Sequence, residues 1–97
     1  MANYVILVNW TPQGIEDVRN TTKRATEGAT VLKSLGGKLK NIVWTTGPYD
    51  AVLTVEAPDD ETVTTFCLAA GLQGNVRTTT MRAFDRAEMA AIIERLP

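Results

Sequence analysis

Apolar and polar residues follow two different periods along the chain, and four segments have the period or composition of β-strands. The first, YVILV, is aliphatic and aromatic without polar alternation, which is typical of a central strand covered on both faces. In the second, Ile42 and Trp44 point to the face opposite Val43, because side chains alternate along a strand. The four predicted strands cover residues 4–8, 38–46, 50–55 and 75–84.

Three segments between and after these strands carry the signals of helices. Thr11-Pro12 predicts a helix start with a threonine N-cap, and the apolar stripe that follows ends at Gly36-Gly37. Acidic residues 59–61 predict the start of a second helix, which closes near Gly71. Asp85 with Glu88 has the spacing of a capping box at the start of a short C-terminal helix.

The order of these elements predicts an α+β fold of the ferredoxin-like type, βαββαβ with an extra C-terminal helix. In this arrangement two helices cover one face of a four-stranded antiparallel sheet. No linker or repeat interrupts the order, so residues 1–97 are expected to form a single domain.

The other face of such a sheet stays bare, and its composition predicts an interface. Alternation gives the first strand apolar side chains on both sides. Whichever face the helices cover, large apolar groups therefore remain exposed on the other face. The C-terminal helix, about 15 Å long, is too short to cover the whole sheet. We therefore expect a homodimer or higher homo-oligomer with sheets face to face, the terminal helix bracing an edge or the partner. The residues assigned to this interface are Tyr4, Ile6, Val8, Ile42, Trp44 and Val52.

Composition narrows the classes of function. Among 97 residues, 44% are hydrophobic and the net charge is −1, which is typical of a globular domain and gives no basic surface for nucleic acid or anionic lipid. The single cysteine, Cys67, cannot form an internal disulfide, and the longest apolar run is far too short for a membrane span. The sequence predicts a cytoplasmic protein that binds neither nucleic acid nor a membrane.

The residue types for metal, haem or nucleotide chemistry are scarce. Histidine is absent, no carboxylates cluster at ligand spacing, and the glycine pairs do not match a phosphate-binding loop. We expect no metal site, no cofactor and no assigned catalytic residue. Cys67 lies mid-helix between apolar neighbours and is interpreted as a buried thiol.

Tyr49 and Asp50 are the best remaining candidates for a ligand site, because they lie where a turn meets a strand end. They have two interpretations. In one, Asp50 caps turn amides and Tyr49 packs over the sheet edge. In the other, both line a cavity for a small oxygenated ligand. The predicted ligand-binding set is Tyr49, Asp50, Trp10, Asn9, Arg24 and Arg77.

The segments NWTPQGI, LGGKLK, WTTGPYDAVLTVEAPDD and GNVRTTTMRAF together resemble the GYD domain family, over roughly residues 4–84. Pro48 occupies the variable position of the signature, which therefore reads Gly-x-Tyr-Asp. The resemblance implies a ferredoxin-like fold related to dimeric α/β barrel proteins. It also implies a small bacterial protein, in a family without an assigned reaction.

Two classes of function follow. The first is a small oligomeric domain that binds a small organic ligand between its sheet and helices. The alternative is a cofactor-independent monooxygenase or isomerase acting on a small oxygenated or aromatic substrate, with Tyr49 and Asp50 as polar anchors. The lack of side chains that titrate near pH 7 favours the first.

Overall fold

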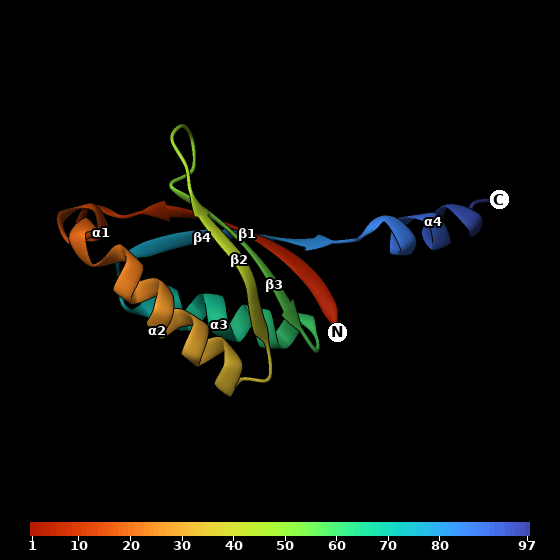
Figure 1. The fold of residues 1–97 in the computed structure, drawn as a ribbon, viewed down its shortest axis with the longest axis horizontal. Coiled ribbons are helices and arrows are strands. Elements are labelled where there is room, and N and C mark those ends of the chain that lie inside the picture. The colour runs from red at the N-terminus through yellow and green to blue at the C-terminus, as the bar shows by residue number, and fades with distance from the viewer.

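A computed structural model describes all residues, 1–97, and confirms the predicted fold class (Figure 1). Four antiparallel strands form one sheet in the order β2-β3-β1-β4, and α2 and α3 cover one of its faces. The elements in chain order are β1 (Ala2–Trp10), α1 (Pro12–Glu16), the 3₁₀ turn η1 (Val18–Asn20), α2 (Thr21–Ser34), β2 (Lys38–Trp44), β3 (Ala51–Ala57), α3 (Asp60–Leu72), β4 (Val76–Ala83) and α4 (Arg86–Glu94).

The predicted helix starts are confirmed at the level of single hydrogen bonds. The Thr11 side chain accepts from the Gly14 amide at 3.1 Å, and Asp59 accepts from the Thr62 amide at 2.8 Å. Asp85 and Glu88 form the complete capping box. These bonds satisfy amides that a helix N-terminus otherwise leaves without partners.

The first helical segment is not continuous, contrary to the prediction. It breaks between α1 and α2, where the Asp17 amide bonds back to the Gly14 carbonyl and the Asp17 carboxylate accepts from Asn20 Nδ2 at 2.7 Å. Aspartate and asparagine compete for local hydrogen bonds in this way and so interrupt helices. The break lets α2 turn back across the sheet (Figure 1).

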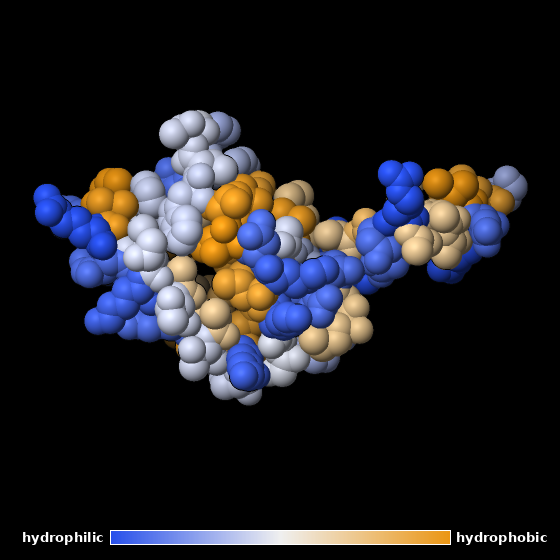
Figure 2. Space-filling model, viewed as in Figure 1, coloured by the Kyte–Doolittle hydropathy of each residue, from blue (hydrophilic) through white to orange (hydrophobic).

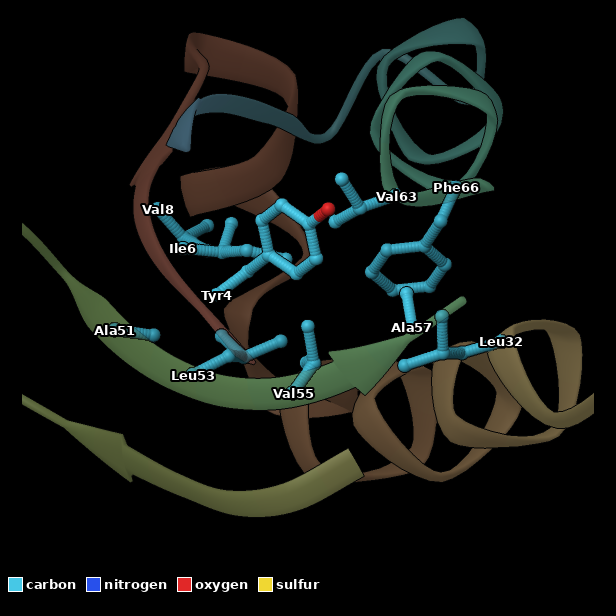
Figure 3. Close-up of a cluster of buried hydrophobic side chains, with 10 residues drawn as sticks. All are labelled: Tyr4, Ile6, Val8, Leu32, Ala51, Leu53, Val55, Ala57, Val63 and Phe66. Carbon is cyan, nitrogen blue, oxygen red and sulfur yellow. The ribbon is translucent and has the colours of Figure 1, made fainter. Parts of the chain in front are cut away.

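The core lies between the sheet and the helices, and it corrects the predicted interface. Tyr4, Ile6 and Val8 are buried here within one chain, so their assignment to the bare face is wrong. Ile42 and Trp44 lie on this same face, because they pair with core residues of β3. Figure 3 shows the ten core residues, which come from both layers: Tyr4, Ile6, Val8, Leu32, Ala51, Leu53, Val55, Ala57, Val63 and Phe66.

The opposite face of the sheet is open and apolar at its centre. Of the predicted interface residues, only Val52 lies on it, between Val43 on β2 and Leu7 on β1. The next row brings Val5 beside Met81 of β4. Val43 and Met81 are 46% and 45% exposed. The open face, defined by these five residues, has no cover within the chain.

The C-terminal helix does not supply that cover. α4 extends away from the body (Figure 1), and only its first turn is held, by Asn3 Nδ2 donating to Glu88 Oε1 at 3.2 Å. Figure 2 shows hydrophobic side chains over the sheet and a separate group on α4. Met89 and Ile93 are among the exposed apolar residues of this helix. No helix in the structure combines the length and apolar composition that a bilayer crossing requires.

A partly buried polar contact joins the central strand to the start of α3. The Tyr4 hydroxyl donates to Asp60 Oδ1. This hydrogen bond and the burial of the ring raise the pKa of Tyr4 to about 12. The phenol therefore stays protonated at neutral pH and acts as a fixed donor in the core.

Two glycines give a matched test of how tightly the α1 turn is packed. A Cβ on Gly14 would lie 1.9 Å from the Asn75 carbonyl oxygen, whereas a Cβ on Gly71 would meet nothing within 4 Å. We predict that Gly14→Ala lowers the free energy of unfolding by about 2 kcal/mol or more, because backbone must move. Gly71→Ala should raise it by roughly 0.5–1 kcal/mol, since alanine is the better helix former. Urea unfolding measures both, and equal effects would contradict the packing described.

Candidate functional site

A cavity of about 110 Å³ lies between the sheet and helices α2 and α3. Its wall is mostly apolar, and five of its residues are drawn in Figure 3: Ile6, Val8, Ala51, Leu53 and Phe66. Figure 2 shows a small hollow in the surface between α2 and the sheet. The residues lining the cavity are Ile6, Val8, Trp10, Thr21, Arg24, Ala25, Ile42, Trp44, Ala51, Leu53, Phe66, Ala70, Val76 and Thr78.

The cavity exists because the helices present small side chains opposite large ones on the strands. Ala25 of α2 and Ala70 of α3 form part of the wall, while Trp10 and Trp44 come from strand ends. Protein interiors are normally close-packed, so a void of several atoms' volume is uncommon. Tyr4 and Val63, which do not line the cavity, are 3% and 2% exposed where the two layers meet.

Trp44 connects the two layers at the rim of the cavity. Its indole Nε1 donates to Thr21 Oγ1 at 3.0 Å, which joins the end of β2 to the first residue of α2. The ring buries one side against the cavity wall and leaves part of its surface in solvent. Tryptophan suits such a position, because its polar N–H and its apolar ring can face different surroundings.

Arg24 is the only ionisable residue in the cavity wall. Its Nη1 donates to the Asp17 carbonyl at 2.9 Å and forms an ion pair with the Asp17 carboxylate. The Arg24 side chain is only 15% exposed, and its Nη2 is buried without a hydrogen-bond partner. Buried polar groups are nearly always paired, so an unpaired guanidinium nitrogen is an exception that calls for a partner.

A second hollow, also about 110 Å³, adjoins the first between α2 and α3. Four residues belong to both walls and lie between the two spaces: Arg24, Phe66, Ala70 and Val76. The second wall also contains Glu27, Gln73 and Asn75, and it is therefore more polar than the first.

The Gly-Pro-Tyr-Asp turn is tied to the sheet by hydrogen bonds. Asp50 Oδ2 accepts from the Trp10 amide at 2.8 Å, and the Asp50 amide donates to the Val8 carbonyl at 2.8 Å. Asn9 Nδ2 donates to the Pro48 carbonyl at 2.7 Å. The polar groups of the turn are thus used to hold the end of β1, and the amide that Asp50 caps belongs to that strand rather than to the turn.

The predicted ligand-binding residues fall into three places. Trp10 and Arg24 lie together in the cavity wall. Tyr49 and Asp50 lie in the hairpin and are absent from that wall. Asn9 pairs with Arg77 across β1 and β4, on the side of the sheet away from the helices.

Thr21 and Thr78 also belong to the cavity wall, and the prediction omitted them. The available signal was the run of small residues on the inward sides of α2 and α3. Small side chains there indicate a gap between layers, but only the packed structure shows which strand residues face it.

The remaining chemical candidates stay separate from this cavity. Cys67 is half-buried rather than fully buried, and its Sγ lies 3.2 Å from Thr80 Oγ1 at the edge of the sheet. No group of histidine, cysteine or carboxylate residues has the geometry to hold a metal ion.

The role of Asp50 can be tested by a pair of substitutions. Asp50→Ala removes the acceptor of the half-buried Trp10 amide, and we predict that it lowers the free energy of unfolding by about 1–3 kcal/mol. Asp50→Asn keeps an oxygen acceptor at the same position and should cost less than half as much. Urea unfolding distinguishes the two variants, and an equally small loss for both would show that the hydrogen bond is unimportant.

Comparisons with known proteins establish the fold and the family of the chain. The crystal structure of TTHA0845 from Thermus thermophilus aligns with a TM-score of 0.55 at 23% identity, over 88% of this chain and 95% of that chain, which shows a shared fold. None of the curated proteins matches. The sequence profile of the GYD domain matches residues 4–93, nearly the whole chain. The chain therefore belongs to the GYD domain family.

Proposed function

We propose that this chain is a small-molecule-binding domain that holds a compact organic ligand in the cavity between its sheet and helices α2 and α3. The observation that carries this proposal is the cavity itself, an apolar space whose wall includes Arg24, a residue with one buried guanidinium nitrogen that has no hydrogen-bond partner. Apolar walls with a few polar groups are the usual composition of ligand pockets.

The size of the cavity restricts the ligand. At about 110 Å³ it is smaller than the roughly 300–1,000 Å³ of drug-sized pockets. A water molecule occupies about 30 Å³ of liquid, and covalently bonded atoms occupy less, so roughly four to six non-hydrogen atoms fit. A short aliphatic compound matches this volume.

Binding without turnover is supported by the groups in the wall. General acid–base catalysis needs a side chain that can exchange a proton with the substrate, and arginine side chains are poorly suited to this. Arg24 is the only ionisable residue in the cavity wall. The Asp50 carboxylate, which the oxygenase or isomerase alternative would use, bonds the Trp10 amide instead. No observation in the structure favours that alternative.

We also propose that two copies pair through the open face. Its five apolar residues lie on four adjacent strands, and a face of this kind is seldom left in water by a monomer. A twofold axis would bring the same face of each chain together. The exposed apolar side of α4 projects beyond the body and supplies a further surface for the partner.

The ligand proposal is tested with butan-1-ol, a neutral molecule of suitable size. Trp10 and Trp44 are the only tryptophans and both line the cavity, so tryptophan fluorescence reports its occupancy. We predict a saturable change with a dissociation constant in the millimolar range, about −4 kcal/mol. Ala70→Leu should abolish it by filling the cavity, whereas the same change at Ala90, on α4, should not. A non-saturable response equal in all three proteins would contradict the proposal.

The assembly proposal is tested by a charge on the open face. Val52→Asp places a carboxylate at its centre and should convert a dimer to a monomer in sedimentation velocity, because an unpaired charge cannot be buried cheaply. Thr64→Asp introduces the same charge on the exposed surface of α3 and should leave the dimer intact. A wild-type chain that sediments as a monomer at high concentration would refute the pairing.

A further inference from the structure

We infer that the ligand of this cavity carries a carboxylate, which accepts a hydrogen bond from Arg24 Nη2 while its short apolar chain occupies the space between the sheet and α3. This inference rests on the proposed function and specifies its ligand class: small aliphatic carboxylates. Two observations support it: the incomplete hydrogen bonding of the Arg24 guanidinium group and the distribution of charged residues around the cavity.

Of the two terminal nitrogens of the Arg24 guanidinium group, Nη1 has hydrogen-bond acceptors and Nη2 has none. Nη1 of Arg24 donates to both the carbonyl and the carboxylate of Asp17, while Nη2 is buried with no acceptor, and the residue belongs to the cavity wall. A buried donor without a partner loses its hydrogen bonds to water and forms none within the protein, which destabilises the fold. An oxygen atom of a ligand can supply the missing acceptor, and a carboxylate does so most strongly, because charge-assisted hydrogen bonds are about twice as strong as neutral ones.

The surroundings favour negative charge at this point. No acidic side chain belongs to the cavity wall, and the apolar residues around Arg24 screen its charge poorly. Asp17 is about half exposed, so water screens its opposing charge more strongly. Thr21, also in the wall, is the first residue of α2, and the first turn of this helix contains no acidic residue. The N-terminal end of a helix stabilises an anion.

Two hydroxyl groups can bind the remaining oxygen of a carboxylate. Thr21 Oγ1 accepts from Trp44 Nε1, so its own O–H remains available to donate. Thr78 of β4, the other threonine in the wall, is the candidate for a second hydroxyl donor. The adjoining hollow between the helices is less suitable for an anion, because Glu27 lies in its wall.

The test compares butanoate with butanamide at pH 7, since the two molecules have nearly the same size and only one is charged. Tryptophan fluorescence and calorimetry should show butanoate binding at least about tenfold more tightly, a factor that corresponds to about 1.4 kcal/mol. Arg24→Met should remove this preference while the affinity for butanamide stays within about twofold. Arg19→Met, the same change at an exposed arginine of η1, should leave the preference unchanged.

Asp17→Asn separates a binding role of Arg24 from a purely structural one. It keeps the guanidinium group and removes its carboxylate partner, so butanoate should bind as tightly or more tightly than to the wild-type chain. A loss of butanoate affinity in a folded Asp17→Asn protein would overturn the inference.

The comparison in the wild-type chain does not depend on the folding of any variant. Equal affinities for butanoate and butanamide would overturn the carboxylate inference and leave the binding function in place. Failure of butanoate, butanamide and butan-1-ol alike to saturate the protein would contradict the binding function and the inference together.

Discussion

The central strand β1 is apolar on both faces. This property determines where the helices pack and which face of the sheet remains uncovered. On one face, Tyr4, Ile6 and Val8 are buried beneath α2 and α3. Each fully buried large apolar side chain contributes roughly 1.5–3 kcal/mol, so this face determines where the helices pack. On the other face, Val5 and Leu7 lie in an open apolar surface that the chain does not cover. A covered face with a cavity and an uncovered apolar face are therefore two consequences of one strand.

The cavity is a region at one end of the core where the side chains are not close-packed. The free energy lost there is of two kinds, since apolar walls lack contacts across the void and Arg24 Nη2 lacks an acceptor. Arg24 belongs to the wall of the void, and we propose that one molecule with an apolar chain and an anionic end would reduce both losses. Departures from good packing and hydrogen bonding that coincide in this way are expected at functional sites.

The fold could be predicted from the sequence, but the residues that form the candidate site could not. Periodicity, caps and the hairpin turn are local signals, and the structure contains all four strands and the capping box at Asp85. Period-two alternation separates two faces of β1 but cannot say which one the helices cover, and this is why the predicted face of Tyr4 is wrong. The break at Asp17 depends on hydrogen bonds that compete with the helix. The sequence groups Asp50 with Arg24, yet the partner of Asp50 is the Trp10 amide, forty residues away along the chain.

Nuclear Overhauser effects between bound butanoate and the two tryptophan side chains test the binding site most directly, because both indole rings lie in the wall of one cavity. If the ligand occupies that cavity, its methyl protons will show contacts to ring protons of both Trp10 and Trp44, and these contacts will vanish in Ala70→Leu. Contacts confined to α4 or to the open face, with none to the indoles, would contradict a ligand site between the sheet and the helices.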